Sequence, residues 1–433
     1  MAVRFYNARI LSLENGMNVD FGEVHTDGGI ISYVGGSENA PKGSFEREIN
    51  LNGNLIMPSF KNAHTHSAMT FLRSYADDLP LQDWLFKQVF PMEAKLTGDD
   101  IYNFSAIAFA EYLTSGITAD FDMYFEPEYM AEVSEDIGFR TVMCGSVAGS
   151  EDECDAALTK LETLYNKYKD RSEFVSYRLG FHAEYTTHVS IMNGIGELAK
   201  KYKAPVYTHN SETLSETKEC IERHGYTPTE LMERAGIFEY GGGGFHCVYM
   251  SDNDIEIFRR RGLWAVTNPC SNAKLASGIA PLVKMTEKGI KLAIGTDGAA
   301  SNNALDMFRE MYLAAVMQKI QLKDAAAMPA DRILRMACCG SANAMGLDNC
   351  DGIAKGKKAD LIVIDLNAPN MRPLHNIPKN LVYSGSKQNV LLTMCAGKIL
   401  YENGEFTTID LEKAYSYADA AIKRMTNDQE RTR

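Results

Sequence analysis

The stretch Met57–Thr70, MPSFKNAHTHSAMT, places two histidines, His64 and His66, one residue apart at the end of an apolar run. Residues two apart on an extended strand point to the same side, so both imidazoles are expected to face one point in space. Neutral imidazole is a good ligand for Zn²⁺. Two ordinary histidines are nevertheless commoner than a metal site. The motif therefore predicts a metal only if other strands supply further ligands.

Strand-like and helix-like segments alternate through the middle of the chain. Helical periodicity is clear in residues 100–116 and 190–203, and a longer helical tract runs from 303 to about 346. This alternation predicts a parallel sheet, and eight strands predict a closed (β/α)₈ barrel of the α/β class. The expected strands are residues 55–66, 117–125, 140–147, 176–184, 205–212, 243–250, 263–270 and 291–300.

The two ends of the chain carry a different pattern. Near the start, VRFYNARILSLE and GEVHTDGGIISYVGG are short apolar strands broken by glycines, and residues 359–365 and 390–400 are similar in kind. From this pattern we expect three parts. They are a small β-sandwich domain made of residues 1–56 and 356–410, a catalytic barrel of residues 57–355, and a C-terminal helix of residues 411–433.

Polar residues at the ends of the barrel strands are the candidates for a site, because active sites of such barrels lie there. Five of the nine histidines and three acidic residues fall at these ends: His64, His66, His182, His209, His246, Glu184, Glu212 and Asp297. Four of them converge from three strands and leave a position for water, as a catalytic metal requires: His64, His66, His209 and Asp297. Zn²⁺ lowers the pKa of a bound water from about 15.7 to about 7.

Each of the remaining polar residues has a functional and an ordinary interpretation. Glu212 is placed to pass a proton from water to a ring nitrogen of the substrate, although its HNSET context is also typical of a helix start. His246 either hydrogen-bonds the attacking hydroxide and the developing oxygen or is a buried structural histidine. Asp297, within GTDGAA, either binds metal and accepts a proton or forms a turn.

The segment HAE, residues 182–184, matches half of the signature of the zinc deaminases that act on cytosine or adenine bases. That class also requires P-C-x-x-C. Here Pro269 and Cys270 are followed by SNA, so the second cysteine is missing. This departure excludes that class and favours a substrate contact for His182.

Composition and charge limit the partners. The chain has 433 residues, of which 45% are hydrophobic and 23% charged, as in ordinary globular proteins. A net charge of −13 argues against nucleic acid or an anionic membrane as a partner. No signal-peptide core or membrane span is recognisable, and nine scattered cysteines are typical of reduced thiols in the cytoplasm. The apolar helix predicted at residues 307–320 suits either packing against the barrel or contact between subunits. The sequence is therefore compatible with both a monomer and a homo-oligomer.

The motifs together resemble the amidohydrolase superfamily. The similar segments are PSFKNAHTHSAMTFLRSYADDLPLQDWL, HNSET, FHCVYM, NPCSNAKLASGIAP and IGTDGAASNN. Within the superfamily they are similar to the branch of S-adenosylhomocysteine, methylthioadenosine and adenosine deaminases, which also holds the triazine chlorohydrolases. The resemblance implies one divalent metal, because members with two carry a carboxylated lysine at the end of strand four, where this chain has none. Zn²⁺ is the first choice, and Fe²⁺, Mn²⁺ or Ni²⁺ also suit three nitrogens and one oxygen.

The resemblance further implies substrate contacts. Glu93 matches the glutamate that binds the ribose hydroxyls in nucleoside deaminases of this branch. Trp84 matches an aromatic residue near the substrate, and His182 matches a contact to the nucleoside. Glu212 and His246 match the residues that handle protons.

One departure from the branch bears on the substrate. Members that accept S-adenosylhomocysteine hold its amino-acid tail with arginines after strand three, whereas residues 144–160 here contain four carboxylates and no arginine. We therefore expect a hydrolytic deaminase of an amino-purine nucleoside with a neutral 5′ end, such as adenosine, 5′-deoxyadenosine or 5′-methylthioadenosine. The alternatives are a deaminase or chlorohydrolase of a free base or s-triazine, such as guanine or melamine, and a non-catalytic scaffold protein.

Overall fold

Eight parallel strands form a nearly closed barrel, as the sequence predicts. The computed structural model describes residues 1–14, 16–79 and 81–430. The strands follow chain order around the barrel, so each pairs with its neighbour in sequence. Between the last strand and the first, the Asp297 amide donates a hydrogen bond of 3.0 Å to the His64 carbonyl. The strands are β6 (Phe60–Thr65), β7 (Ile117–Asp122), β8 (Arg140–Cys144), β9 (Val175–Gly180), β10 (Val206–Asn210), β11 (Gly242–His246), β12 (Trp264–Thr267) and β13 (Lys291–Ile294).

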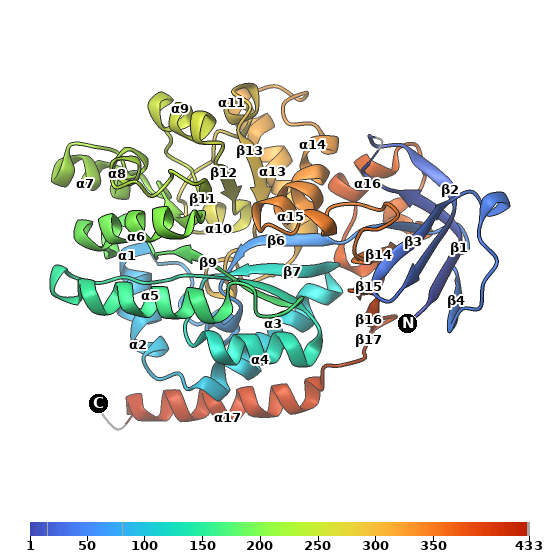
Figure 1. Ribbon diagram of the computed structural model, residues 1–433, viewed down its shortest axis with the longest axis horizontal. Helices are drawn as coiled ribbons and strands as arrows, with labels where there is room; N and C mark the ends of the chain where they lie inside the picture. Colours follow the sequence, from blue (N-terminus) through green and yellow to red (C-terminus); the bar gives the residue numbers. More distant parts are fainter. Residues whose placement is uncertain (15, 80, 431–433) are drawn as a thin grey trace.

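Helices cover the outside of the barrel (Figure 1). Several begin at a capping box, in which a threonine or serine hydroxyl bonds the amide three residues on and the acidic residue there bonds back. These capping boxes fix the residue at which each of these helices begins. The helices between the strands and after the barrel are α1 (Leu81–Trp84), α2 (Phe90–Glu93), α3 (Gly98–Thr114), α4 (Pro127–Ile137), α5 (Cys154–Tyr168), α6 (Val189–Tyr202), α7 (Leu214–His224), α8 (Pro228–Arg234), α9 (Asp252–Arg261), α10 (Pro269–Lys274), α11 (Leu282–Glu287), α12 (Ala299–Asn302), α13 (Met307–Leu322), α14 (Ala330–Arg335), α15 (Ser341–Ala344) and α16 (Ile377–Tyr383).

The predicted first strand, residues 55–66, is two strands that belong to different sheets. β5 (Leu55–Pro58) pairs with strands from both ends of the chain, whereas β6 pairs with β7. Pro58 has no N–H, so it cannot donate a backbone hydrogen bond to a neighbouring strand. The amide of Ser59 still bonds the Asp360 carbonyl at 3.1 Å. A single residue, Ser59, therefore separates the two sheets.

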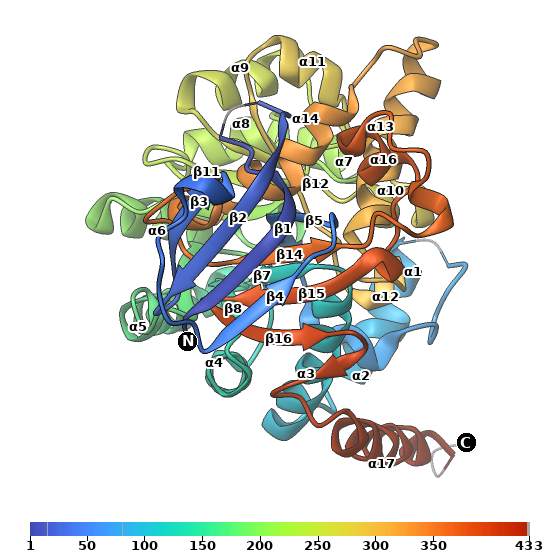
Figure 2. The same ribbon diagram turned by 90° about the vertical axis from the view of Figure 1, so that its right-hand side faces the viewer.

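The ends of the chain build a second, nine-stranded sheet beside the barrel (Figure 2). Its order is β17-β16-β15-β14-β5-β1-β2-β3, with β4 next to β1, so the expected sandwich is one continuous hydrogen-bonded sheet. It encloses an apolar core of its own, which includes Val24, Ile56 and Leu361. The domain boundaries stay a prediction. The strands besides β5 are β1 (Val3–Leu11), β2 (Val19–Asp27), β3 (Ile30–Gly35), β4 (Arg47–Asn50), β14 (Leu361–Ile364), β15 (Val390–Cys395), β16 (Lys398–Glu402) and β17 (Glu405–Phe406).

A buried group of charges joins the two sheets. Asp360, just before β14, accepts hydrogen bonds from Arg140 of β8 at 2.9 and 3.2 Å, and the ammonium of Lys61 of β6 lies 3.8 Å from it. All three side chains are almost completely buried. Burial alone would raise the pKa of Asp360, but the charges of Arg140 and Lys61 lower it to about 2. The carboxylate is therefore ionised and holds the small sheet to the barrel.

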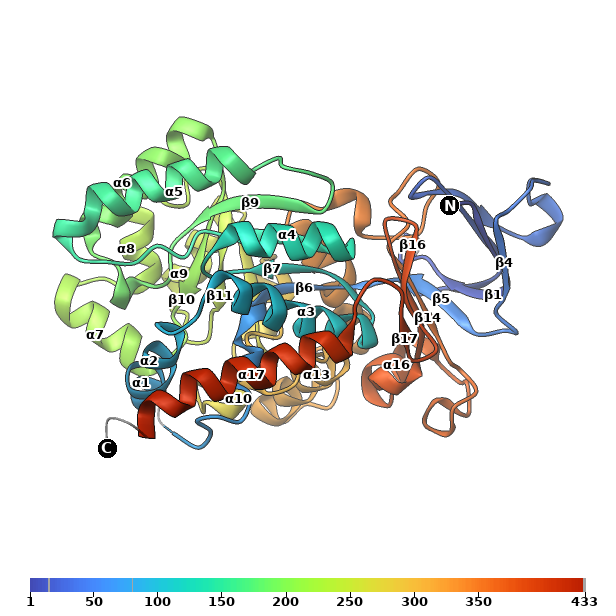
Figure 3. The same cartoon turned by 90° about the horizontal axis from the view of Figure 1, so that it is seen from below.

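The predicted C-terminal helix is α17 (Leu411–Glu430), and residues 431–433 of that prediction lie outside the described residues. It runs along the outside of the barrel beside α3 (Figure 3). Among the described residues, no helix has the length and apolar character that crossing a membrane requires.

Candidate active site

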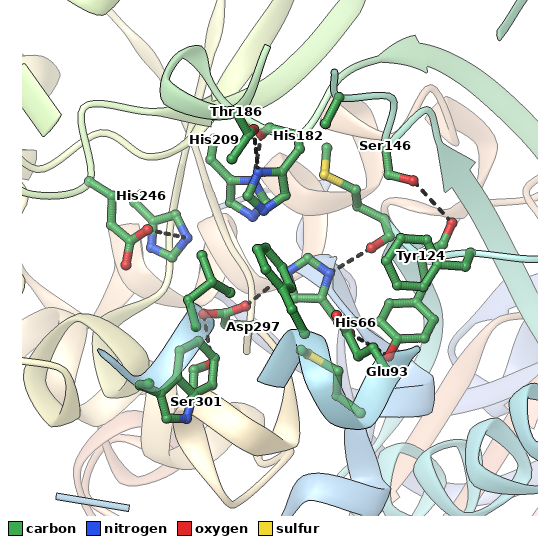
Figure 4. Close-up of a pocket in the computed structure, with 18 of the residues that line it drawn as sticks. His66, Glu93, Tyr124, Ser146, His182, Thr186, His209, His246, Asp297 and Ser301 are labelled. Carbon is green, nitrogen blue, oxygen red and sulfur yellow. Dashed lines mark hydrogen bonds and ion pairs between the residues drawn. The ribbon is translucent and has the colours of Figure 1, made fainter. Parts of the chain in front are cut away.

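The four predicted metal ligands come from the carboxyl ends of three strands, and Figure 4 shows three of them, His66, His209 and Asp297, around one centre. His64 lies in β6 with His66 directly after it, His209 lies in β10, and Asp297 follows β13. One carboxylate oxygen of Asp297 is 3.3 Å from Nε2 of His66 and 3.6 Å from Nε2 of His64. Ligand atoms of the three histidines lie within 4.8 Å of one another. Ligand atoms of His64, His246 and Asp297 form a second group within the same distance. His64 belongs to both groups, so the four predicted ligands lie around one candidate ion position.

Hydrogen bonds orient two of the imidazoles toward the centre. Nδ1 of His66 donates to the Met123 carbonyl at 2.6 Å, and Nδ1 of His209 donates to the His182 carbonyl at 2.7 Å, so each Nε2 keeps its lone pair. Burial and the neighbouring histidines hold the pKa of His64 and His209 well below the ordinary value, so both rings are neutral. Neither nitrogen of the buried His64 ring has a hydrogen-bond partner among the described residues. Because an unpaired buried nitrogen is costly, this residue set fits a metal ion.

Asp297 is held as an ionised ligand. One of its oxygens accepts hydrogen bonds from the hydroxyls of Ser271 at 2.6 Å and Ser301 at 2.7 Å, and the other accepts from the Gly298 amide at 2.8 Å. Burial alone would raise the pKa of Asp297, but nearby imidazoles and these hydroxyls lower it. The turn interpretation also holds, because its φ of 59° places Asp297 in the left-handed region.

Glu212 and His246 face each other beside the metal ligands. Oε2 of Glu212 lies 3.8 Å from Nε2 of His246, and its other oxygen accepts from the Ser277 hydroxyl at 3.2 Å. Nδ1 of His246 donates to the Asn272 side-chain oxygen at 2.8 Å, which leaves Nε2 to face Glu212 and the centre. The carboxylate and the imidazole thus face each other beside the predicted metal ligands.

The helix-start interpretation of Glu212 does not hold. Helix α7 is capped by Thr213, and the carboxylate that completes its capping box is that of Glu216. Glu216 also accepts the amides of Ser211 and Glu212 at 3.0 and 2.7 Å. The Glu212 side chain is therefore free of capping and turns into the site.

One cavity of about 320 Å³ contains this centre. Every predicted site residue except the fully buried His64 lines it: His66, Trp84, Glu93, His182, His209, Glu212, His246 and Asp297. The rest of the wall is largely apolar or aromatic, with Met69, Phe90 and Phe125 among its residues. None of the described residues that line this cavity is a lysine or an arginine.

Of the predicted substrate contacts, Glu93 lies on the side of the cavity away from His246, and His182 lies beside His209 (Figure 4), with ring centroids 4.9 Å apart. Glu93 ends the short helix α2, and its Oε1 accepts a hydrogen bond of 2.6 Å from Tyr124. Burial raises the pKa of Glu93 to about 7, although the Tyr124 hydrogen bond acts in the opposite direction. His182 is joined to Thr186 at 2.8 Å, and burial lowers the pKa of His182 to about 4, so its ring is neutral.

Sequence reasoning missed the residues that hold these groups in place. Tyr124 is the polar residue near the end of the predicted strand 117–125, so the rule that found the other site residues would also have found it. Ser271 and Ser301 lie within the motifs NPCSNAKLASGIAP and IGTDGAASNN but were not assigned a task. Met123 acts through its carbonyl, which leaves no signal in the sequence.

Strained backbone surrounds the site. Ser211, His246, Cys247 and Asp297 all adopt positive φ values, between 50° and 70°, although none is glycine. Each such residue costs roughly 1–3 kcal/mol and persists only where other contacts fix it. At Cys247 the fixing contact is a hydrogen bond of 3.1 Å that its amide donates to the Asn210 carbonyl. Strain of this kind gathers at functional sites, in agreement with the ligand geometry.

Comparison with known proteins agrees with this site. The model of the amidohydrolase family matches residues 55–400, which are most of the chain. The chain belongs to the amidohydrolase family. As an amidohydrolase it has a metal site of three histidines and one aspartate at the carboxyl ends of its barrel strands.

Relatives of this amidohydrolase include two deaminases. A 5-methylthioadenosine/S-adenosylhomocysteine deaminase from Caldanaerobacter subterraneus subsp. tengcongensis is 38% identical over 94% of this chain and 95% of its own length. A 5′-deoxyadenosine deaminase from Methanosarcina acetivorans is 36% identical over 97% of both chains. Among solved structures, an adenosine deaminase from Xanthomonas campestris with bound zinc superposes with a TM-score of 0.92, at 30% identity over 98% of both chains.

Proposed function

We propose that this amidohydrolase is a metal-dependent hydrolytic deaminase of an amino-purine nucleoside. The purine amino group leaves as ammonia, and an oxygen from water takes its place on the ring carbon. The observation that carries the proposal is that one cavity is lined by three of the metal ligands, the Glu212–His246 pair and, on the side away from His246, Glu93. The names of the two relatives, which cover almost the whole chain, support this assignment.

His64, His66, His209 and Asp297 hold one divalent ion, with Zn²⁺ as the first choice. The lone pairs that face the centre and the unpaired His64 ring support this ligand set, and the zinc in the Xanthomonas campestris structure supports the metal. When bound, the ion lowers the pKa of water from about 15.7 to about 7, so that hydroxide is available at neutral pH.

Glu212 moves the proton that the reaction needs. It accepts a proton from the attacking water and delivers it to the ring nitrogen next to the carbon under attack. His246 and Asp297 steady the oxygen that adds to the ring and pass a proton to the departing ammonia. The 3.8 Å separation between Glu212 and His246 lets both groups reach the same reacting atoms.

Three further residues that line the cavity bind the nucleoside. Glu93 accepts hydrogen bonds from the ribose hydroxyls, while Trp84 and His182 contact the substrate. The apolar wall and the lack of a lysine or arginine among its described residues support a neutral 5′ end, as in adenosine, 5′-deoxyadenosine and 5′-methylthioadenosine. The nine cysteines are all free thiols, which supports a cytoplasmic location.

Ammonia release from a panel of substrates tests the proposal. The panel holds adenosine, 5′-deoxyadenosine, 5′-methylthioadenosine, guanine and melamine, each with the zinc-loaded protein. We expect release from at least one nucleoside and none from guanine or melamine. Silence on all three nucleosides would reject the proposal. Turnover of guanine or melamine alone would support the alternative chemistry on the same scaffold, and Glu93→Ala would then leave activity intact, because a free base has no ribose.

A further inference from the structure

The C-terminal helix α17 is remote in sequence from the site but contacts the segment that carries Glu93. Figures 1 and 3 show it running beside α3. Met425 of α17 is buried in the same apolar cluster as Trp84 and Met92, which lie on either side of the π-helical turn before Glu93. Helix α17 therefore backs the wall of the cavity that Glu93 and Trp84 form.

Asp100, in the first turn of α3, is where the polar contacts between the two helices meet. Its side chain is fully buried. One oxygen accepts hydrogen bonds from the amide and the hydroxyl of Thr97 at 2.7 and 2.8 Å and forms an ion pair with Arg424. The other accepts from the Tyr417 hydroxyl at 3.1 Å. Because a buried carboxylate is costly without partners, Arg424 and Tyr417 determine where Asp100 and Thr97 lie.

Thr97 is separated from Glu93 by a single tight turn. The Leu96 amide bonds the Glu93 carbonyl at 3.0 Å, and the Lys95 ammonium donates to the Met425 carbonyl of α17 at 2.6 Å. Glu93 itself lies on α2, a helix of four residues, and has no barrel strand to hold its backbone. The turn after Glu93 is thus fixed from outside, at Lys95 and at the Thr97–Asp100 cap, by α17.

We propose that Arg424, together with Tyr417 and Lys95, is a positioning residue for nucleoside binding. It holds the turn after Glu93 so that the Glu93 carboxylate meets the ribose hydroxyls. The inference rests on the proposed function, because the task of Glu93 does. The metal ligands lie at the ends of barrel strands, so Arg424 acts on the binding of the ribose and leaves the chemical step unchanged.

The test compares two substrates in the variant Arg424→Gln, which keeps part of the side chain and removes its charge. We expect KM for adenosine or 5′-methylthioadenosine to rise roughly threefold to tenfold, the equivalent of one weakened hydrogen bond, while kcat stays within about twofold. KM for 2′,3′-dideoxyadenosine, which lacks the ribose hydroxyls, should stay unchanged. Introducing Arg424→Gln into Glu93→Ala should add no further rise, since the group being positioned is gone.

Two further variants separate positioning from general stability. Lys95→Met should raise the nucleoside KM in the same selective way, because it removes the second contact to α17. Arg259→Gln serves as the matched control, since this exposed arginine forms its ion pair with Glu256 on its own helix. Zinc content and thermal melting are measured for each protein.

An equal loss for nucleoside and dideoxynucleoside in Arg424→Gln would overturn the inference, and so would an unchanged nucleoside KM. Persistence of the full KM rise in the Glu93→Ala background would overturn it as well. If the unchanged protein deaminates no nucleoside, the proposed function fails and the inference fails with it. If the unchanged protein deaminates nucleosides normally, any one of these three results rejects the positioning role and leaves the proposed function intact.

Discussion

The Tyr124 hydroxyl donates a hydrogen bond of 2.6 Å to Oε1 of Glu93 inside the substrate cavity. Tyr124 follows barrel strand β7, whereas Glu93 ends the short helix α2, so the bond ties a short peripheral helix to the barrel. It occupies one carboxylate oxygen and leaves Oε2 and the remaining lone pairs for a ligand. Figure 4 shows Glu93 and Tyr124 near His66, on the side of the cavity away from His246.

Tyr124→Phe should weaken nucleoside binding. The phenyl ring preserves the shape of the wall but removes the hydrogen bond that orients Glu93, so we expect KM for 5′-methylthioadenosine to rise roughly threefold to tenfold. The turnover number should change little, because the metal ligands are intact. Steady-state kinetics measure both values. Tyr129→Phe, on the outer helix α4, is the control, and an unchanged KM in Tyr124→Phe would show that the bond does not position Glu93.

Nucleoside binding should weaken as the pH falls through about 7. Burial raises the pKa of Glu93 to about 7, so the carboxylate that we propose accepts the ribose hydroxyls is ionised above that pH and protonated below it. We expect kcat/KM for adenosine, divided by that for 2′,3′-dideoxyadenosine, to fall by up to about tenfold per pH unit below 7. The ratio cancels groups that act on both substrates. The dependence should vanish in Glu93→Gln, and a flat ratio in the unchanged protein would contradict the prediction.

The sequence was sufficient to predict the barrel and the convergence of the ligands. Alternating strands and helices commonly fold into a parallel sheet, and the carboxyl ends of its strands lie at one face. This was enough to predict that His64, His209 and Asp297 lie close together. The division of residues 55–66 into β5 and β6 was not predicted. An apolar run looks the same whether one sheet or two bury it, and only Pro58 hinted at the break.

The contacts that hold the site residues were harder to predict, because they join positions far apart in the chain. The bond between Tyr124 and Glu93 depends on how α2 packs against β7, and that packing has no local pattern. The contact of Asp100 with Arg424 spans 324 residues. Sequence periodicity describes one helix or strand at a time. It therefore does not predict which residues of two distant elements contact each other.

Glu212→Gln should retain the metal and lose the chemistry. The substituted amide would keep the size of the side chain but could not take a proton from water, and general acid–base catalysis contributes about 10²–10⁴-fold to rates. We expect kcat to fall by that factor while the zinc content of the protein stays unchanged. His64→Ala is the contrasting variant and should lose the zinc. Near-normal turnover in Glu212→Gln would remove this residue from the mechanism, and the measurements are metal analysis and ammonia release.

S-adenosylhomocysteine should be a poor substrate compared with 5′-methylthioadenosine. The two share the nucleoside, but the former ends in a carboxylate and an ammonium, and the described residues lining the cavity include no lysine or arginine. A missing charged hydrogen bond of about 1.5–3 kcal/mol corresponds to a loss of roughly ten- to hundredfold in kcat/KM. Competition between the two substrates in one reaction measures this ratio. Equal values would show that a cation outside the cavity holds the tail.

Asp360→Asn should destabilise the fold without touching the site. The change leaves Arg140 and Lys61 buried without a carboxylate, and removing one partner of a buried ion pair costs about 3–5 kcal/mol. Asp252→Asn is the control, because its ion pair with Lys284 is exposed to solvent and should contribute little to stability. The measurement is the free energy of unfolding in urea at neutral pH.

The pH dependence of that free energy gives an independent check on Asp360. Its pKa of about 2 in the folded chain lies below the ordinary 3.8, so its stabilising contribution is complete above about pH 4 and is lost as the pH falls through about 2. In the unchanged protein this loss adds to the acid destabilisation from other carboxylates, and in Asp360→Asn it is absent. The difference in unfolding free energy between the two proteins should therefore shrink between about pH 4 and pH 2. A difference that stays constant over this range would show that the ionised carboxylate does not hold the small sheet to the barrel.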